Sequence, residues 1–311
     1  MNIAFRIDIG NLIGTGHYYR MSALADAFTE LKHNCFFFKS EDEPVDYSLY
    51  DIVVIDTYQV DDAYISGIKS LSRLTVCYDD NAQYTYDCDV LLNANLHANE
   101  LEFRFGPHLP RLLLGGRYAL LRREFRESDV INIREQANRV FICFGGSDVM
   151  NMTPRVIQAL KTLKGVSLSV ILGGYTKNDN EVLNLLDETV TVYKTPDKIS
   201  NILRECDVAI TASGSMIYEL AVVGMPSIII AQADNQLLIY EYAKREGIAI
   251  CSGTMSSFDV DLIAKETSNL LVNYNKRKTL SDKIKKKVDK NGAINAAVEI
   301  IKCYEMVCNN K

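Results

Sequence analysis

The 311-residue chain contains no tryptophan, only six prolines and only four histidines. It has no apolar run near the roughly 20 residues that span a bilayer, and no basic and apolar leader precedes its first apolar run, Ile3–Ile7. These absences predict a cytoplasmic protein without membrane insertion.

Signatures of metal and polyanion binding are also scarce. The eight cysteines form no Cys-x-x-Cys pair and have no companion histidine, so they do not suggest a zinc site and are expected as small core residues. A formal net charge of -6 argues against a surface for nucleic acids. We therefore expect no metal, no cofactor and no nucleic-acid partner.

Short apolar runs alternate with segments of helical period along nearly the whole chain, a pattern typical of parallel strands joined by crossover helices. Because Arg122–Asn138 is charged and poor in large apolar residues, we expect the linker there, between a domain over 1–135 and a domain over 136–311. The predicted class is therefore α/β with two doubly wound domains. Strands are expected near 2–7, 34–38, 51–55, 74–78, 89–92, 111–114, 140–144, 168–172, 190–193, 207–210, 226–230 and 248–250, and helices near 17–32 and 61–72.

A glycine loop with a histidine follows the first predicted strand, in Gly14-Thr15-Gly16-His17-Tyr18-Tyr19-Arg20. Open α/β sheets bind ligands at the carboxyl ends of their strands, and an imidazole can exchange a proton near neutral pH. His17 is therefore a candidate catalytic base, with Gly14, Gly16 and Arg20 shaping its loop. The alternative is a helix-capping or core histidine. His33, His97 and His108 lack such a setting and are expected on the surface or in loops.

The second half carries three further loops after predicted strands. Gly145-Gly146-Ser147-Asp148 and Ala212-Ser213-Gly214-Ser215 each lead into a helix, where free N–H groups and the helix dipole favour an anion. Glu219 lies one turn inside the second helix and could accept ribose hydroxyls or be a favourable charge near a helix start. Ala233-Asp234-Asn235-Gln236 offers side-chain amides or is an ordinary capped turn.

Taken in order, these loops resemble the nucleotide-sugar hydrolases of pseudaminic acid biosynthesis. These PseG-like and SpsG-like proteins are related to the glycosyltransferase that makes lipid II. Further matches are Ile55-Asp56-Thr57-Tyr58, Tyr78-Asp79-Asp80, Leu92-Asn93-Ala94-Asn95 and Leu114-Gly115-Gly116-Arg117-Tyr118-Ala119-Leu120-Leu121. The resemblance implies a glycosyltransferase-B fold with two Rossmann-like domains facing a cleft. It also implies metal-independent release of UDP from UDP-2,4-diacetamido-2,4,6-trideoxy-β-L-altropyranose, by inverting attack of water at the anomeric carbon.

The resemblance also assigns roles to residues. It implies His17 as the essential histidine and places UDP on Gly146, Ser147, Ser213, Gly214, Ser215, Glu219, Asn235 and Gln236. The positions after first-domain strands are candidates for the sugar, with ordinary turn residues as the alternative: Asp56, Tyr58, Tyr78, Asp79 and Asn95. The substrate is the expected partner of a monomer.

Two rival functions remain open at this stage. One is an inverting UDP-sugar glycosyltransferase, although the first half shows no strong apolar or basic run for a membrane-bound acceptor. The other is a non-catalytic nucleotide-sugar-binding subunit.

The basic segment 276–288 is expected as a helix that buries Leu280, Ile284 and Val288 and exposes its charges. The final segment 293–307 is expected as an amphipathic helix that returns to the first domain.

Overall fold

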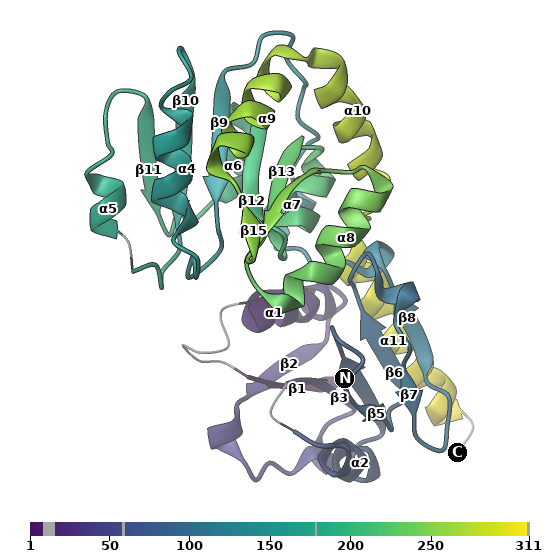
Figure 1. Ribbon diagram of the computed structural model, residues 1–311. Coiled ribbons are helices and arrows are strands. Elements are labelled where there is room, and N and C mark those ends of the chain that lie inside the picture. Colours follow the sequence, from purple (N-terminus) through teal and green to yellow (C-terminus); the bar gives the residue numbers. More distant parts are fainter. Residues whose placement is uncertain (9–15, 58–59, 178, 310–311) are drawn as a thin grey trace. The chain divides into compact units, whose positions relative to one another are not determined.

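The computed structural model describes residues 1–8, 16–57, 60–177 and 179–309, which form two compact units (Figure 1). Unit 1 comprises Met1–Arg126 and Val288–Lys311, and unit 2 comprises Glu127–Lys287. The chain therefore divides after Arg126 rather than at 135, and its last segment, which contains the helix expected to return to the first domain, belongs to the first unit. None of the described helices is long and apolar enough to span a membrane.

Unit 1 is built on a six-stranded parallel sheet with the order β2-β1-β3-β4-β6-β8. The chain passes from β1 to β2 on one side and then to β3 on the other, so the strand order reverses between β1 and β3. The strands are β1 (Asn2–Ile7), β2 (Asn34–Phe38), β3 (Ile52–Asp56), β4 (Leu74–Tyr78), β6 (Val90–Asn93) and β8 (Arg111–Leu114). Two-residue strands β5 (Thr85–Tyr86) and β7 (Arg104–Phe105) form a separate pair.

Three longer helices accompany this sheet: α1 (Gly16–Glu30), α2 (Asp62–Leu71) and α11 (Gly292–Asn309), with the single turn α3 (Arg123–Arg126). The apolar faces of α1 and α11 share one core with the sheet, in which Ala293, Ala296 and Ile300 are buried. A side chain at Gly292 would place its Cβ 2.4 Å from the Ala119 carbonyl oxygen. Glycine is therefore required where α11 begins, against the 3-10 turn Gly116–Tyr118.

Unit 2 has a seven-stranded sheet with the order β11-β10-β9-β12-β13-β14-β15. All neighbours are parallel except the final antiparallel hairpin of β14 and β15. Its strands are β9 (Arg139–Cys143), β10 (Ser167–Leu172), β11 (Val190–Lys194), β12 (Val208–Ala212), β13 (Ser227–Ala231), β14 (Ile250–Thr254) and β15 (Ser257–Phe258). Its helices are α4 (Met152–Leu160), α5 (Asp179–Leu183), α6 (Ile199–Glu205), α7 (Met216–Val223), α8 (Leu237–Glu246), α9 (Val260–Val272) and α10 (Tyr274–Ile284).

The strands follow the sequence prediction closely, because they are short continuous apolar runs. β1, β2, β4 and β8 have the predicted bounds. β14 is shifted: it was expected over 248–250 but begins at Ile250, after the left-handed cap of α8 at Gly247. The burial of the cysteines, which were all expected in the core, varies: five are buried, Cys35 and Cys251 are half-buried, and Cys308 is exposed.

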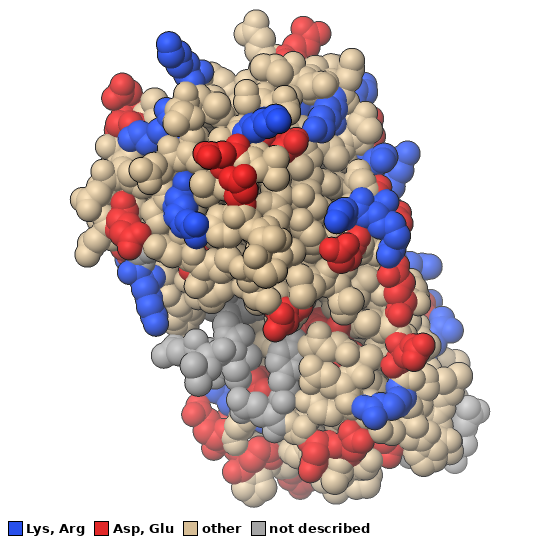
Figure 2. Space-filling model, viewed as in Figure 1, with Lys and Arg blue, Asp and Glu red and all other residues tan. Residues whose placement is uncertain are grey.

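Charges of both signs are interspersed on the face shown in Figure 2, without a single basic patch. The basic segment contains a helix, α10, and Leu280, Ile284 and Val288 are buried as expected. Its charges are not all solvated, however, because Arg277 is fully buried. Arg277 Nη1 donates to the carbonyl oxygens of Leu270 (2.5 Å) and Leu271 (2.6 Å) at the end of α9.

The other amino group of Arg277, Nη2, donates to the carbonyl oxygens of Arg134 (2.7 Å) and Glu135 (3.0 Å). One guanidinium thus satisfies the end of α9 and holds the segment that leads into β9. The sequence places this residue among solvated lysines because periodicity does not show which long side chain turns inward.

We expect Arg277→Met to destabilise unit 2 by about 3 kcal/mol, because four carbonyl oxygens lose a charged donor. Hydrogen exchange should accelerate at the end of α9 and around residues 134–135. The exposed neighbour Lys278→Met is the matched control and should leave exchange unchanged. Equal exchange in both variants would contradict the role assigned to Arg277.

Candidate functional site

The strand order of unit 1 reverses between β1 and β3, and open α/β sheets bind ligands at the carboxyl ends of their strands at such a reversal. His17 lies in the first turn of α1, which follows β1, and Asp56 is the last residue of β3. Their side chains meet: His17 Nδ1 lies 2.8 Å from Asp56 Oδ1, and the two residues are only 4% and 1% exposed.

His17 Nδ1 lies against two neighbours, Asp56 and Arg20. Arg20 Nη2 lies 2.9 Å from the same Nδ1, but Nη2 also contacts Asp56 Oδ1. A guanidinium carries only donors, so the carboxylate is the acceptor that Nδ1–H and Nη2–H can share. With Nδ1 protonated, Nε2 is the proton-accepting atom of the ring, as in a carboxylate–imidazole pair that acts as a base.

Arg20 is the centre of this cluster rather than only a member of the glycine loop. Its Nε donates to Asp56 Oδ2 (2.6 Å), its Nη1 donates to Asp80 Oδ2, and its guanidinium carbon lies 4.1 Å from the centre of the Tyr78 ring. Burial alone would lower the pKa of Arg20, but the two carboxylates raise it well above its ordinary value. Arg20 is therefore permanently charged.

The paired aspartates after β4 have different roles. Asp80, which the sequence analysis did not select, joins the cluster through Arg20 and accepts from Asn95 Nδ2 (2.9 Å). Asp79 instead accepts from the backbone N–H of Ala82 (2.7 Å), and burial raises its pKa. Asp79 is thus a buried turn cap. Because the two aspartates are adjacent and of the same type, the sequence does not indicate which one pairs with Arg20.

Other predicted positions of unit 1 are distributed as follows. Tyr78 and Asn95 lie at the cluster, Gly16 begins α1, and Gly14 and Tyr58 lie outside the described residues. His97 was expected on the surface or in a loop; it lies in the turn after β6, but its side chain is buried, and burial lowers its pKa. The cap at Asp79 is a local turn contact, as the ordinary-turn alternative allowed, whereas the burial of the His97 imidazole does not follow from local pattern.

A second network joins the ends of β1 and β3. Arg6 Nη1 donates to Asp8 Oδ1 (3.0 Å), and the Thr57 hydroxyl donates to Asp8 Oδ2. The backbone N–H of Asp8 donates to the Asp56 carbonyl oxygen (3.4 Å). These bonds fix the strand end from which the Asp56 carboxylate projects.

In unit 2 the strand order reverses around β9, whose neighbours are β10 and β12. The loop after β9 is held by Asp148, which accepts from the backbone N–H groups of Met152 and Thr153 (both 2.8 Å) at the start of α4. A side chain at Gly173 would lie 2.4 Å from the Gly146 carbonyl oxygen, so the loops after β9 and β10 touch. Gly146 is half-buried and Ser147 exposed.

The loop after β12 is held by Ser213, which is fully buried and donates to the carbonyl oxygens of Ile230 (3.4 Å) and Gln236 (3.1 Å). Its hydroxyl is therefore engaged by backbone acceptors of the protein. Gln236 Oε1 accepts from the N–H of Gln232 (2.9 Å), which ties the loop after β13 to itself. The remaining predicted positions are half-buried Gly214, exposed Ser215 and Asn235, and buried Glu219 in the first turn of α7.

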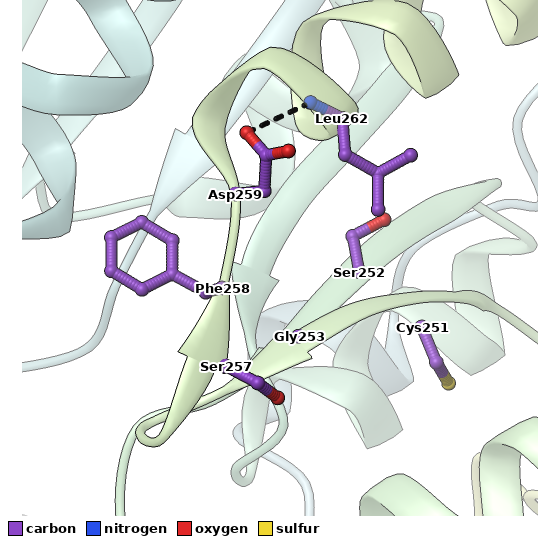
Figure 3. A pocket seen from close by; sticks show the side chains of 7 residues that line it. All are labelled: Cys251, Ser252, Gly253, Ser257, Phe258, Asp259 and Leu262. Atoms are coloured by element: carbon purple, nitrogen blue, oxygen red, sulfur yellow. Dashed lines mark hydrogen bonds between the residues drawn. The ribbon is translucent and has the colours of Figure 1, made fainter.

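The hollow shown in Figure 3 lies elsewhere in unit 2, at the hairpin of β14 and β15. It contains none of the predicted site residues; its lining consists of Cys251, Ser252, Gly253, Ser257, Phe258, Asp259 and Leu262. Across the described ranges, no three His, Cys, Asp or Glu side chains group closely enough to hold a metal ion.

Comparison with known protein families gives no matching family model. Among individual proteins, an uncharacterised protein of Methanocaldococcus jannaschii is 25% identical in an alignment over 285 residues. This alignment covers 79% of this chain, and the chain spans only 59% of that protein. The UDP-2,4-diacetamido-2,4,6-trideoxy-beta-L-altropyranose hydrolase of Campylobacter jejuni is 25% identical over 246 residues, 70% of this chain and 87% of that one. The spore coat polysaccharide biosynthesis protein SpsG of Bacillus subtilis is 18% identical over 98% of this chain and 99% of its own. The chain is a distant relative of these proteins.

Solved structures show the fold. MurG of Acinetobacter baumannii superposes with a TM-score of 0.67 at 14% identity, covering 97% of this chain and all of that one. The glycosyltransferase VinC, solved with dTDP, also gives 0.67, at 12% identity and 98% coverage of this chain. The chain therefore has the glycosyltransferase-B fold, which confirms the predicted class.

We expect Asp56→Asn to destabilise unit 1 by about 2 kcal/mol, because it leaves the buried guanidinium of Arg20 with one carboxylate instead of two. Urea unfolding combined with hydrogen exchange should locate the loss in α1 and β3. Asp26→Asn, an exposed change on α1, is the control. Unchanged exchange at α1 would show that the ion pair does not hold this helix.

Proposed function

We propose that the protein is a nucleotide-sugar hydrolase that releases UDP from UDP-2,4-diacetamido-2,4,6-trideoxy-β-L-altropyranose or a close UDP-deoxy-diacetamido sugar, in pseudaminic acid biosynthesis. The observation that carries this proposal is the His17–Asp56 contact of 2.8 Å at the strand-order reversal of unit 1. The distant relationship to the hydrolase of Campylobacter jejuni supports the substrate class. We take the enzyme to act in the cytoplasm as a monomer.

In this proposal, His17 is the general base. Asp56 accepts the Nδ1–H hydrogen bond, which orients the ring and stabilises the imidazolium that forms when Nε2 takes a proton from water. The hydroxide oxygen bonds to the anomeric carbon as the bond from that carbon to the diphosphate oxygen breaks. The electron pair leaves with UDP, and attack opposite the leaving group inverts the anomeric centre.

Unit 2 supplies the nucleotide site in this proposal. Glu219 accepts hydrogen bonds from the ribose hydroxyls, and the loops after β9, β12 and β13 surround the diphosphate. Ser213 holds its loop through backbone acceptors, so we assign phosphate contact to the Gly214–Ser215 backbone and the α7 start rather than to the Ser213 hydroxyl. Such fixed N–H donors stabilise a leaving diphosphate without a metal ion.

The second candidate is an inverting glycosyltransferase, and one observation favours it. Tyr18 and Tyr19 on α1 are 45% and 47% exposed, directly after His17, and the Tyr18 ring lies 6.4 Å from that of Phe37 on the edge strand β2. Phe36 and Phe37 are also exposed. These aromatic groups could contact an acceptor, so release of UDP only on addition of an acceptor would favour this candidate. A non-catalytic subunit would bind the UDP-sugar without turnover.

We expect purified protein to release UDP from the UDP-diacetamido sugar without an acceptor and in the presence of EDTA, with inversion of the first-formed anomer. His17→Asn should lower kcat by about a hundredfold or more, because general base catalysis contributes about that much. NMR follows both UDP release and the anomer. His108→Asn, an exposed change, is the control. Retention of configuration, or full activity of His17→Asn, would contradict the mechanism.

We expect Glu219→Gln to weaken UDP binding by about tenfold or more, because the amide offers one neutral acceptor oxygen where the carboxylate offers two charged ones to the ribose hydroxyls. Isothermal titration calorimetry measures this directly. The exposed Glu241→Gln on α8 is the control. Equal loss with UDP and with 2′,3′-dideoxy-UDP as ligands would show that Glu219 does not act through the ribose hydroxyls.

A further inference from the structure

The turn after β6 encloses polar atoms that the protein itself does not satisfy. Asn93, the last residue of β6, is 0% exposed, and His97, four residues later, is 5% exposed. Asn93 Nδ2 and both ring nitrogens of His97 have no hydrogen-bond partner within the described part of the chain. A buried polar group without a partner costs about 1–3 kcal/mol, and most such groups are paired.

The rest of this turn is well satisfied, which makes these atoms distinct. The backbone N–H of Asn95 donates to Asn93 Oδ1 (2.9 Å), so the turn uses the oxygen of the Asn93 amide but not its nitrogen. The His97 carbonyl oxygen accepts from the N–H of Glu100 (2.8 Å), so the backbone of His97 has a structural role that its ring does not share.

The turn is adjacent to the candidate site. β6 pairs with β4 in the parallel sheet, and Asn95 Nδ2 donates to Asp80, which pairs with Arg20. A continuous series of contacts therefore runs from His17 through Arg20 and Asp80 to the turn. The carboxyl end of a parallel sheet is also where ligands bind in this class of fold.

The donors and acceptors of the pair define the ligand chemistry. Asn93 offers N–H donors, and a neutral imidazole offers one donor and one acceptor. Burial lowers the pKa of His97, which favours the neutral ring, although the negative charges of Asp80 and Glu100 oppose this shift. Arg20 is already paired with two carboxylates, so an anionic ligand group would meet negative charge here. An uncharged group with one acceptor and one donor fits best.

We propose that Asn93 and His97 bind a secondary amide of the substrate's sugar, with Asn93 donating to the amide oxygen and His97 accepting from the amide N–H. This assignment rests on the proposed function, because an N-acylated sugar brings such an amide to unit 1. It identifies two binding residues for the sugar beyond Asp56, Tyr78 and Asn95. Both residues bind substrate and neither transfers a proton in the reaction.

The first test is steady-state kinetics with the UDP-diacetamido sugar. His97→Phe keeps an aromatic ring, and Asn93→Asp keeps the oxygen that Asn95 uses while removing the donor. We expect each to raise KM by about tenfold, the effect of one hydrogen bond to a buried group, with a smaller change in kcat. Affinity for UDP alone should stay unchanged, and the exposed His108→Phe is the control.

The second test observes His97 directly. In the His17→Asn variant, the ring nitrogens of His97 are followed by NMR while the UDP-diacetamido sugar and, separately, UDP are added. We expect the sugar nucleotide, and not UDP, to shift the His97 signals. Absence of that shift, together with an unchanged KM in folded variants, would overturn the proposal and assign a buried water as the partner of these atoms.

The two tests separate the subsite from the proposed function. Turnover by the wild-type protein without a response of His97 supports the hydrolase and contradicts the subsite. A response of His97 to the sugar nucleotide without turnover by the wild-type protein contradicts the hydrolase and supports the subsite. If His97→Phe is unstable, Asn93→Asp and the NMR titration decide between these outcomes.

Discussion

The candidate site of unit 1 depends on the neutralisation of buried carboxylates by Arg20. Asp56 is almost wholly removed from water, and an unpaired carboxylate there would be strongly unfavourable. Arg20 contacts both of its oxygens and also reaches Asp80, so one guanidinium connects α1 to the ends of β3 and β4. The sheet topology makes this connection possible, because α1 begins after β1, at the strand-order reversal between β1 and β3. The orientation of His17 follows from the position of the carboxylate.

The loops of unit 2 use side chains differently. Asp148 and Ser213 contact backbone groups of their own domain and so fix the loops after β9 and β12. In both loops a buried polar side chain therefore fixes the shape of the backbone. In the proposed function, that backbone supplies the N–H donors for an anion. A short motif such as Ser-Gly-Ser contains both kinds of residue and does not distinguish them.

The sequence was informative where local physics decides the outcome. Parallel strands covered on both faces are continuous apolar runs, and the buried strands β1 and β4 have the predicted limits for that reason. The edge strands β2 and β8 also have the predicted limits, because they are apolar runs although their residues are largely exposed. The sequence was uninformative where the outcome depends on the direction in which a side chain points or on a partner that is distant along the chain. Asp79 and Asp80 are adjacent residues of the same type, yet Asp79 caps a turn and Asp80 pairs with Arg20. Arg277 was misplaced among solvated side chains, because a periodic pattern does not reveal a partner more than one hundred residues away. His97 lies in a loop, as one of the two expected settings, but the sequence did not show that its ring is buried there.

The carboxylate–imidazole pair does not by itself distinguish hydrolysis from sugar transfer. A base that removes a proton from water also removes one from an alcohol, and the departure of the diphosphate is the same in both reactions. The choice of nucleophile must therefore come from what surrounds the base. Exposed aromatic rings at Tyr18 and Tyr19 would suit an acceptor, whereas the polar turn at Asn93 and His97 is buried and, in our proposal, contacts the donor sugar. Hydrolysis requires that the bound sugar leave room beside His17 for water alone, so the residues that position the sugar also determine the reaction.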